Sequence, residues 1–251
     1  MPDPMIRIGE EDCASDIVKR YYRTATVFKK YDIPYCCGGK WPLRLVFETK
    51  GLDTETVLSE IRQAALMIPV PAALPFSTWK IDFLTEYIIN VHHSYLRESL
   101  PFIKTQLEHF VVEHRKKYPY VVELQEVFEN LHRTLFPHLS MEEEIIFPYI
   151  RQIAHAYESR ESYASLLVRT LRKPVEDLMH HEHQFTVKAL DRFRSLTRAY
   201  QPPEAACTSH HLLLALLHEL DNNLVQHLHL ENDILFPRAV AMEKELLANK
   251  P

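Results

Sequence analysis

Two stretches of this sequence repeat the same arrangement of residues that can bind metal ions. Residues 138–148 read HLSMEEEIIFP, and residues 227–237 read HLHLENDILFP. The stretches lie 89 positions apart and agree at six of eleven positions, which indicates two related structural units. Each copy begins with a histidine and has a glutamate four residues later. On a helix this spacing brings both side chains to one face, with Cβ atoms about 5–6 Å apart.

The helix faces that carry these pairs are otherwise apolar. A glutamate on an apolar face is costly to bury unless it is paired or binds a metal ion. We therefore expect Glu142 and Glu231 either to be paired or to bind a metal ion. The two faces comprise Leu131, Leu135, His138, Glu142 and Ile145 in the first copy, and Leu220, Leu224, His227, Glu231 and Ile234 in the second.

Histidines in two further stretches can complete such a site. His93 shares a helix face with apolar residues such as Leu96, whereas the spacing places His92 among more polar neighbours. In the second stretch, His183 shares a face with Leu190 and is preferred over the two histidines just before it. His93 and His183 lie 90 positions apart, close to the period of the repeat.

Four imidazoles and two carboxylates on inward faces suit a pair of first-row metal ions. Imidazole binds iron, zinc and copper, and a carboxylate can bridge two ions about 3.5–4 Å apart. The spacing does not choose the metal, because zinc or manganese fits these ligands too. The alternative is a set of core histidines and surface glutamates arranged by chance.

The elements that must position these side chains are helices. Apolar residues recur at helical spacing in the segments 77–117, 119–155, 160–199 and 205–247. Long helices with short connections favour an antiparallel arrangement. We therefore predict an all-α fold with a four-helix bundle around the metal site. Pro137 directly precedes His138 and predicts a kink or a helix start.

A small module precedes the bundle. Three prolines between Ile68 and Pro75 indicate a linker, because proline removes a backbone donor and disfavours helix in the residue before it. We predict a small helical domain over residues 1–67, a linker over 68–76, and the bundle over 77–251.

The small domain contains two adjacent cysteines, Cys36 and Cys37, followed by two of the four glycines. We expect an amphipathic helix over about residues 13–31 before them and a helix with Asp53 as its N-cap after them. Adjacent cysteines can act as thiolates toward iron or a partner, or form a strained, easily reduced disulfide. We predict a redox or partner-contact role for this pair, and the alternative is a turn that holds two small residues.

The composition excludes several classes of protein. Of 251 residues, 46% are hydrophobic and 25% are charged, and the formal net charge is −5. A disordered chain and a nucleic-acid-binding protein are therefore not expected. No apolar stretch reaches the roughly 18–20 residues of a membrane span, and the first residues lack the pattern of a signal peptide. We expect a cytoplasmic protein that binds neither nucleic acid nor membrane.

The repeated H-x-x-x-E-x-x-I-x-F-P pattern, with the histidines before it, resembles the hemerythrin-like di-iron bundle. Residues 30–40, KYDIPYCCGGK, are similar to the signature of the N-terminal domain of the iron–sulfur cluster repair di-iron proteins. The resemblance extends over nearly the whole chain and implies two non-haem iron ions with oxo or carboxylate bridges. By motif, the iron ligands it implies are His93, His138, Glu142, His183, His227 and Glu231.

The same resemblance implies a function. Members of this family restore iron–sulfur clusters damaged by nitric oxide or oxidants, often as homodimers. The implied partners are damaged iron–sulfur proteins or a scaffold, with oxygen or nitric oxide as the small ligand. A hemerythrin-like oxygen or nitric oxide carrier or sensor is one alternative, and a nitric oxide reductase is another. Whether iron is donated or used catalytically, and hence whether the protein is an enzyme, stays open at this level.

Overall fold

The computed structural model describes residues 7–36, 39–66, 74–160, 164–171 and 175–248, without the side chains of residues 164, 167 and 170–182. These residues are largely helical and contain no β-strand, which confirms the predicted all-α fold. The chain divides into two compact units, residues 1–72 with 197–218 and residues 73–196 with 219–251. The predicted domain boundaries stay predictions, and most of the predicted linker lies outside the described residues.

The first unit is built mainly from short helices: α1 (Ala14–Arg20), η1 (Tyr22–Thr24), α2 (Ala25–Lys30), α3 (Leu43–Lys50) and α4 (Thr54–Ala65). The expectation of one helix over residues 13–31 is wrong, because the chain leaves the helix at Tyr21 and continues through a 3₁₀ turn. The spacing of apolar residues does not reveal α3. The predicted N-cap is confirmed, since the Asp53 carboxylate accepts a hydrogen bond from the backbone N–H of Thr56 at 2.9 Å.

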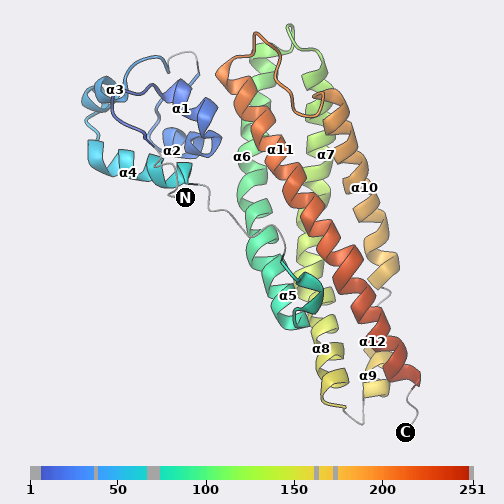
Figure 1. The fold of residues 1–251 in the computed structure, drawn as a ribbon. Coiled ribbons are helices and arrows are strands. Elements are labelled where there is room, and N and C mark those ends of the chain that lie inside the picture. Colours follow the sequence, from blue (N-terminus) through green and yellow to red (C-terminus); the bar gives the residue numbers. More distant parts are fainter. Residues whose placement is uncertain (1–6, 37–38, 67–73, 161–163, 172–174, 249–251) are drawn as a thin grey trace. The chain divides into compact units, whose positions relative to one another are not determined.

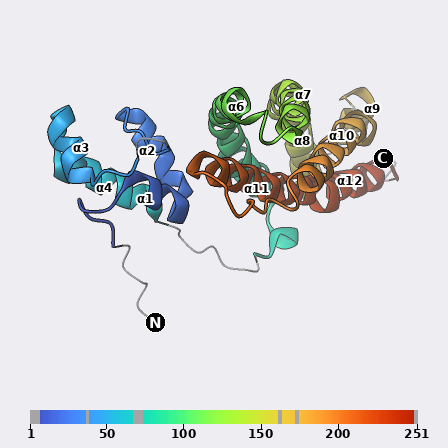
Figure 2. The same ribbon diagram turned by 90° about the horizontal axis from the view of Figure 1, so that it is seen from above.

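The second unit contains the long helices of the bundle. In chain order the elements are α5 (Ile81–Tyr87), η3 (Ile88–His93), α6 (Ser94–His114), α7 (Tyr120–Met141), η4 (Glu142–Ile146), α8 (Phe147–Glu158), α9 (Ala164–Leu171), α10 (Val175–Leu196), α11 (Thr208–His229), η5 (Leu230–Leu235) and α12 (Phe236–Ala248). Residues of α11 belong to both units. Figures 1 and 2 show α7 side by side with α6 and with α10 in this unit, and α12 continues the direction of α11.

In the described part of the chain, three π-helical turns interrupt the bundle helices. They are η3 between α5 and α6, η4 between α7 and α8, and η5 between α11 and α12. A π turn closes its hydrogen bonds over five residues instead of four and so shifts the register of the faces that follow. The prediction that Ile145 faces the core is therefore wrong: its side chain is 46% exposed, and Ile146 is fully buried in its place.

Pro137 is accommodated within a helix. α7 runs from Tyr120 to Met141 through this proline, so the helix start predicted there is wrong. His138, the next residue, keeps a buried position. The predicted kink stays a prediction.

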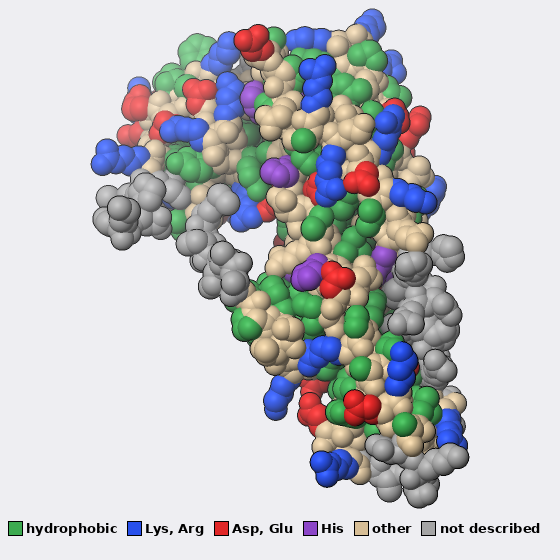
Figure 3. All heavy atoms as spheres, turned by 45° about the vertical axis from the view of Figure 1, so that its right-hand side comes forward, with side chains coloured by type: hydrophobic (Ala, Val, Ile, Leu, Met, Phe, Trp, Pro, Cys, Tyr) green, Lys and Arg blue, Asp and Glu red, His purple; other side chains and the backbone are tan. Residues whose placement is uncertain are grey.

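The surface is of mixed character. On the face drawn in Figure 3, acidic and basic side chains are interspersed with hydrophobic ones. Among the described residues, no helix combines the length and the apolar character that crossing a membrane requires.

Candidate metal centre

The second unit brings six histidine and glutamate side chains into one buried cluster. All six predicted site residues of the bundle take part, and none is more than 4% exposed. They form two groups of four that could each hold a cation, and both glutamates belong to both groups. The groups are His93, Glu142, His227 and Glu231, and His138, Glu142, His183 and Glu231.

The four imidazoles meet in two pairs. The Nε2 atoms of His93 and His227 lie 3.2 Å apart, and the Nε2 atoms of His183 and His138 also lie 3.2 Å apart. In each pair the two rings are close to perpendicular. Each pair therefore points two ring nitrogens at one location.

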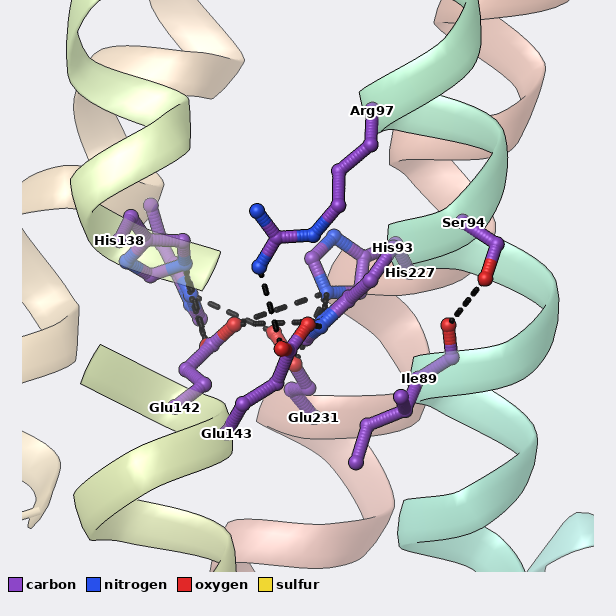
Figure 4. A network of polar contacts seen from close by, with 10 residues as sticks. Ile89, His93, Ser94, Arg97, His138, Glu142, Glu143, His227 and Glu231 are labelled. Carbon is purple, nitrogen blue, oxygen red and sulfur yellow. Dashed lines mark hydrogen bonds and ion pairs between the residues drawn. The ribbon is translucent and has the colours of Figure 1, made fainter. Parts of the chain in front are cut away.

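The two carboxylates connect the imidazole pairs. For Glu142, Oε1 lies 3.1 Å from Nε2 of His138 and Oε2 lies 3.4 Å from Nε2 of His93. For Glu231, Oε1 lies 2.9 Å from Nε2 of His227 and Oε2 lies 3.4 Å from Nε2 of His183. Each carboxylate thus presents one oxygen to each pair, and Figure 4 shows Glu142 and Glu231 approaching the centre from different helices.

Burial and close contact shift the protonation of these groups. Burial raises the pKa of the Glu231 carboxyl to about 8, and the neighbouring Glu142 adds to this rise. Burial also opposes ionisation of Glu142, but the surrounding imidazoles, His138 first, outweigh it and hold the pKa of this carboxyl well below its ordinary value. Burial lowers the pKa of His227 to about 3. This imidazole is therefore neutral at pH 7, as a metal ligand must be.

The donor set fits bound cations. Among the described residues, no hydrogen bond of good geometry reaches either oxygen of Glu142 or Oε2 of Glu231, although all three atoms are buried. Buried carboxylate oxygens are costly without a partner. A cation placed between them and the facing ring nitrogens would accept lone pairs from both.

Three of the predicted ligands lie within π turns. His93 is the last residue of η3, Glu142 is the first of η4, and Glu231 is the second of η5. Directly after η3, the hydroxyl of Ser94 donates a hydrogen bond back to the backbone carbonyl of Ile89 at 3.2 Å, as drawn in Figure 4. Such turns occur frequently at functional sites.

The same turn corrects the prediction for His92. The helical spacing puts His92 on a polar face, but its side chain is only 1% exposed. Its ring stacks on that of His227, with centroids 5.9 Å apart, and also contacts the ring of Tyr87. The six-residue π turn brings both His92 and His93 inward, which a constant helical period does not predict.

His93 and His183 each have an outer hydrogen-bond partner. Nδ1 of His93 lies 2.8 Å from Oε1 of Glu143, and Arg97 donates to Oε2 of the same carboxylate at 3.1 Å. Nδ1 of His183 lies 2.8 Å from Oδ1 of Asn232. When Nε2 binds a metal ion, Nδ1 carries the proton and donates to such an oxygen.

Sequence reasoning finds only part of this outer layer. From sequence, Glu143, Glu144 and Glu182 are candidates for this outer layer, because each stands beside or near a predicted ligand. Glu143 contacts His93, whereas Glu144 is exposed. The side chain of Glu182 lies outside the described part of the chain. Arg97 and Asn232 are missed. The repeat contained a signal for Asn232, which occupies the position of Glu143 in the second copy.

The cysteines predicted for redox or partner contact lie in the first unit. Cys36 is partly buried, and Cys37 lies outside the described residues. The loop packs tightly, since a Cβ atom on Gly39 would lie 2.7 Å from Cα of Tyr35. A glycine is therefore required there. The predicted role of the cysteines stays a prediction.

Comparison with known proteins gives matches over most of the chain. Residues 11–65 match a family described as a domain of unknown function (DUF542, ScdA_N), and residues 85–239 match the hemerythrin HHE cation binding domain. The iron–sulfur cluster repair protein YtfE of Enterobacter sp. (strain 638) is 31% identical over 228 residues, which cover 91% of this chain and 96% of the relative. The iron–sulfur cluster repair protein ScdA of Staphylococcus haemolyticus (strain JCSC1435) is 27% identical over 231 residues, which cover 91% of this chain and 98% of the relative.

Proposed function

We propose a function from the premise that this chain belongs to the family of the iron–sulfur cluster repair proteins and carries their hemerythrin HHE domain. The proposal is that the protein takes part in the repair of damaged iron–sulfur clusters through two iron ions held in its bundle. The names of the relatives support repair over the alternatives of a carrier, a sensor or a nitric oxide reductase.

One observation carries the proposal of two ions. Each of the two buried carboxylates offers one oxygen to the His93–His227 pair and the other to the His138–His183 pair. A carboxylate that contacts two groups of imidazoles in this way is suited to bridge two metal ions. We call the two locations position A, between His93 and His227, and position B, between His138 and His183.

The side chains of this site have distinct tasks. The imidazoles bind through Nε2, and Glu143 and Asn232 fix the orientation of His93 and His183 through Nδ1. Phe147 stacks on His93 and Phe236 stacks on His183, and both apolar rings are buried and limit the access of water. Iron held in such a site would supply one-electron chemistry and open coordination positions for a small ligand.

The remaining parts of the proposal come from the family. The substrates are iron–sulfur proteins whose clusters have been damaged, and oxygen or nitric oxide is the small ligand of the iron. The protein acts in the cytoplasm as a homodimer. Cys36 and Cys37 contact the client protein or exchange electrons with it.

The first test is metal content. Full-length protein prepared without oxygen and loaded with ferrous iron should bind about two iron ions per chain. His138→Gln and His227→Gln should each reduce this number, because each removes one imidazole from one position. Glu144→Gln is the matched control, since it removes an exposed carboxylate two residues from Glu142. Full iron binding by both histidine variants would contradict the site.

The second test is repair. An iron–sulfur hydratase inactivated by nitric oxide should regain activity when the loaded protein is added, and the two histidine variants should fail to restore it. A Cys36→Ser, Cys37→Ser double variant that binds two iron ions but repairs poorly would support a role of the cysteines in client contact. Steady turnover of nitric oxide to nitrous oxide with a reductant, without repair, would favour the reductase alternative.

A further inference from the structure

The outer contacts of His93 and His183 differ in charge. His93, in position A, faces the carboxylate of Glu143, whereas His183, in position B, faces the neutral amide of Asn232. Both Nδ1-to-oxygen distances are 2.8 Å. The geometry of the two contacts is therefore matched, and the charge of the acceptor is what distinguishes them.

The internal repeat shows that this difference involves two residues. Asn232 stands 89 positions after Glu143, at the same place in the second copy. Val187 stands 90 positions after Arg97, the spacing that also separates His93 from His183. The first copy of the repeat thus has an Arg97–Glu143 ion pair behind His93. The second copy has a valine and an asparagine at the corresponding places behind His183.

The ion pair fixes the direction of the carboxylate. Arg97 binds Oε2 of Glu143 at 3.1 Å and leaves Oε1 facing His93, as Figure 4 shows. A hydrogen bond from Nδ1–H to a carboxylate is charge-assisted and makes the imidazole a stronger donor to a metal ion. A neutral amide oxygen has the same geometry but a weaker effect.

We propose that Glu143 is a positioning residue that makes the two cation positions unequal, so that position A binds its cation more tightly than position B. This inference rests on the proposed pair of metal ions. Loss of an outer partner typically lowers metal affinity 10- to 100-fold. The lower end applies here, because the Glu143 side chain is 26% exposed and Arg97 offsets part of its charge.

Two isosteric substitutions test the proposal in opposite directions. Glu143→Gln keeps an acceptor oxygen but removes its charge, and should lower the affinity of position A about tenfold. Asn232→Asp adds a charge behind His183 and should raise the affinity of position B several-fold. Glu144→Gln is again the matched control, because it makes the same change at an exposed neighbour.

The experiment is a titration of the full-length, metal-free protein with Co²⁺, followed by proton NMR of the exchangeable imidazole N–H signals that the bound ion shifts. In the wild type, the first equivalent should shift the His93 signal and the second the His183 signal. In the fully loaded protein, Glu143→Gln should change the chemical shift of the first signal only, and Asn232→Asp that of the second only. These changes assign the first signal to His93 and the second to His183. Both substitutions should reduce the preference for position A, and Glu144→Gln should leave it unchanged.

The outcomes separate this inference from the proposed function. If the wild type binds two Co²⁺ ions and the two signals grow together, the proposed inequality of the positions is overturned. The proposed site for two metal ions would still stand. A preference for position A in Glu143→Gln equal to that of the wild type would likewise overturn the role of Glu143. Binding of fewer than two ions by the wild type would overturn both proposals.

Discussion

The two halves of the bundle carry the same predicted ligands in different surroundings. The half formed by η3, α6, α7 and η4 has a π turn at both of its ligand-bearing segments. In the other half, α10 runs as a regular helix from Val175 to Leu196, and only η5 is a π turn. The histidines and glutamates coincide in the repeat, but the residues behind His93 and His183, Glu143 and Asn232, differ. The two halves therefore share the candidate ligands but differ in the outer contacts behind them.

The halves also do not correspond to the two cation positions. Position A combines His93 of the first half with His227 of the second, and position B combines His138 with His183. Neither half contains a complete imidazole pair. The repeat therefore describes two structural units that build the site only together.

The largest expected effect tests this cross-pairing. A His93→Gln, His227→Gln double variant removes both imidazoles of position A and should retain about one metal ion per chain. A His93→Gln, His138→Gln double variant removes one imidazole from each position and should retain none after desalting. Metal analysis of the desalted proteins distinguishes them. One ion retained by the second variant and none by the first would mean that each half forms its own site.

A medium effect is expected away from the metal centre, where the halves differ in an ion pair between a buried carboxylate and a half-exposed guanidinium. Asp221 occupies the repeat position of His132, and its side chain is 5% exposed and binds Arg194 through both oxygens, at 2.5 and 2.7 Å. Asp221→Ala should lower the free energy of unfolding by about 2 kcal/mol. This is less than a fully buried pair would lose, because the half-exposed guanidinium can turn to water.

The same arginine provides the control for this prediction. Asp191 also contacts Arg194, at 3.0 Å, but its side chain is 65% exposed. Asp191→Ala should therefore change the free energy of unfolding by about 0.5 kcal/mol or less. Urea unfolding of both variants measures the two values, and equal losses would contradict the dependence on burial.

The smallest effect concerns the pH dependence of stability and His132, the residue that corresponds to Asp221 in the first copy of the repeat. Burial, and to a lesser degree Lys104, lowers the pKa of His132 below its ordinary value. The unfolded chain then takes up the proton more readily than the folded chain, so acidification through about pH 6.5 favours unfolding. His132→Gln should remove this contribution. The urea midpoint should fall less between pH 7.5 and 5.5 in the variant than in the wild type, and an equal fall would refute the assignment.

Much of the fold and the candidate site follows from local spacing. The four-residue separation of His138 and Glu142 places both on one helix face, and the structure buries both. The gaps between the four predicted segments fall at or beyond the ends of helices in the structure, and Asp53 caps α4 as its residue type and position indicate. These features depend on residues only a few positions apart, so a reader of the sequence can find them.

Other features escape because they depend on departures from the regular helix. The burial of His92 and the exchange of Ile145 for Ile146 both come from π turns. A π turn is stable only where the packing of neighbouring helices compensates for its poorer backbone geometry. The spacing of residues within one helix therefore does not predict a π turn.

The sequence by itself determined which residue types stand at which helix faces, and hence that four imidazoles and two carboxylates point inward. Only the tertiary structure decided that His93 pairs with His227 and His138 with His183, and that Glu143 and Asn232 lie behind two of them. The physical reason is distance along the chain. Helical spacing relates residues within one or two turns, whereas these contacts join positions 45 to 134 residues apart. They exist only once the helices have packed against one another.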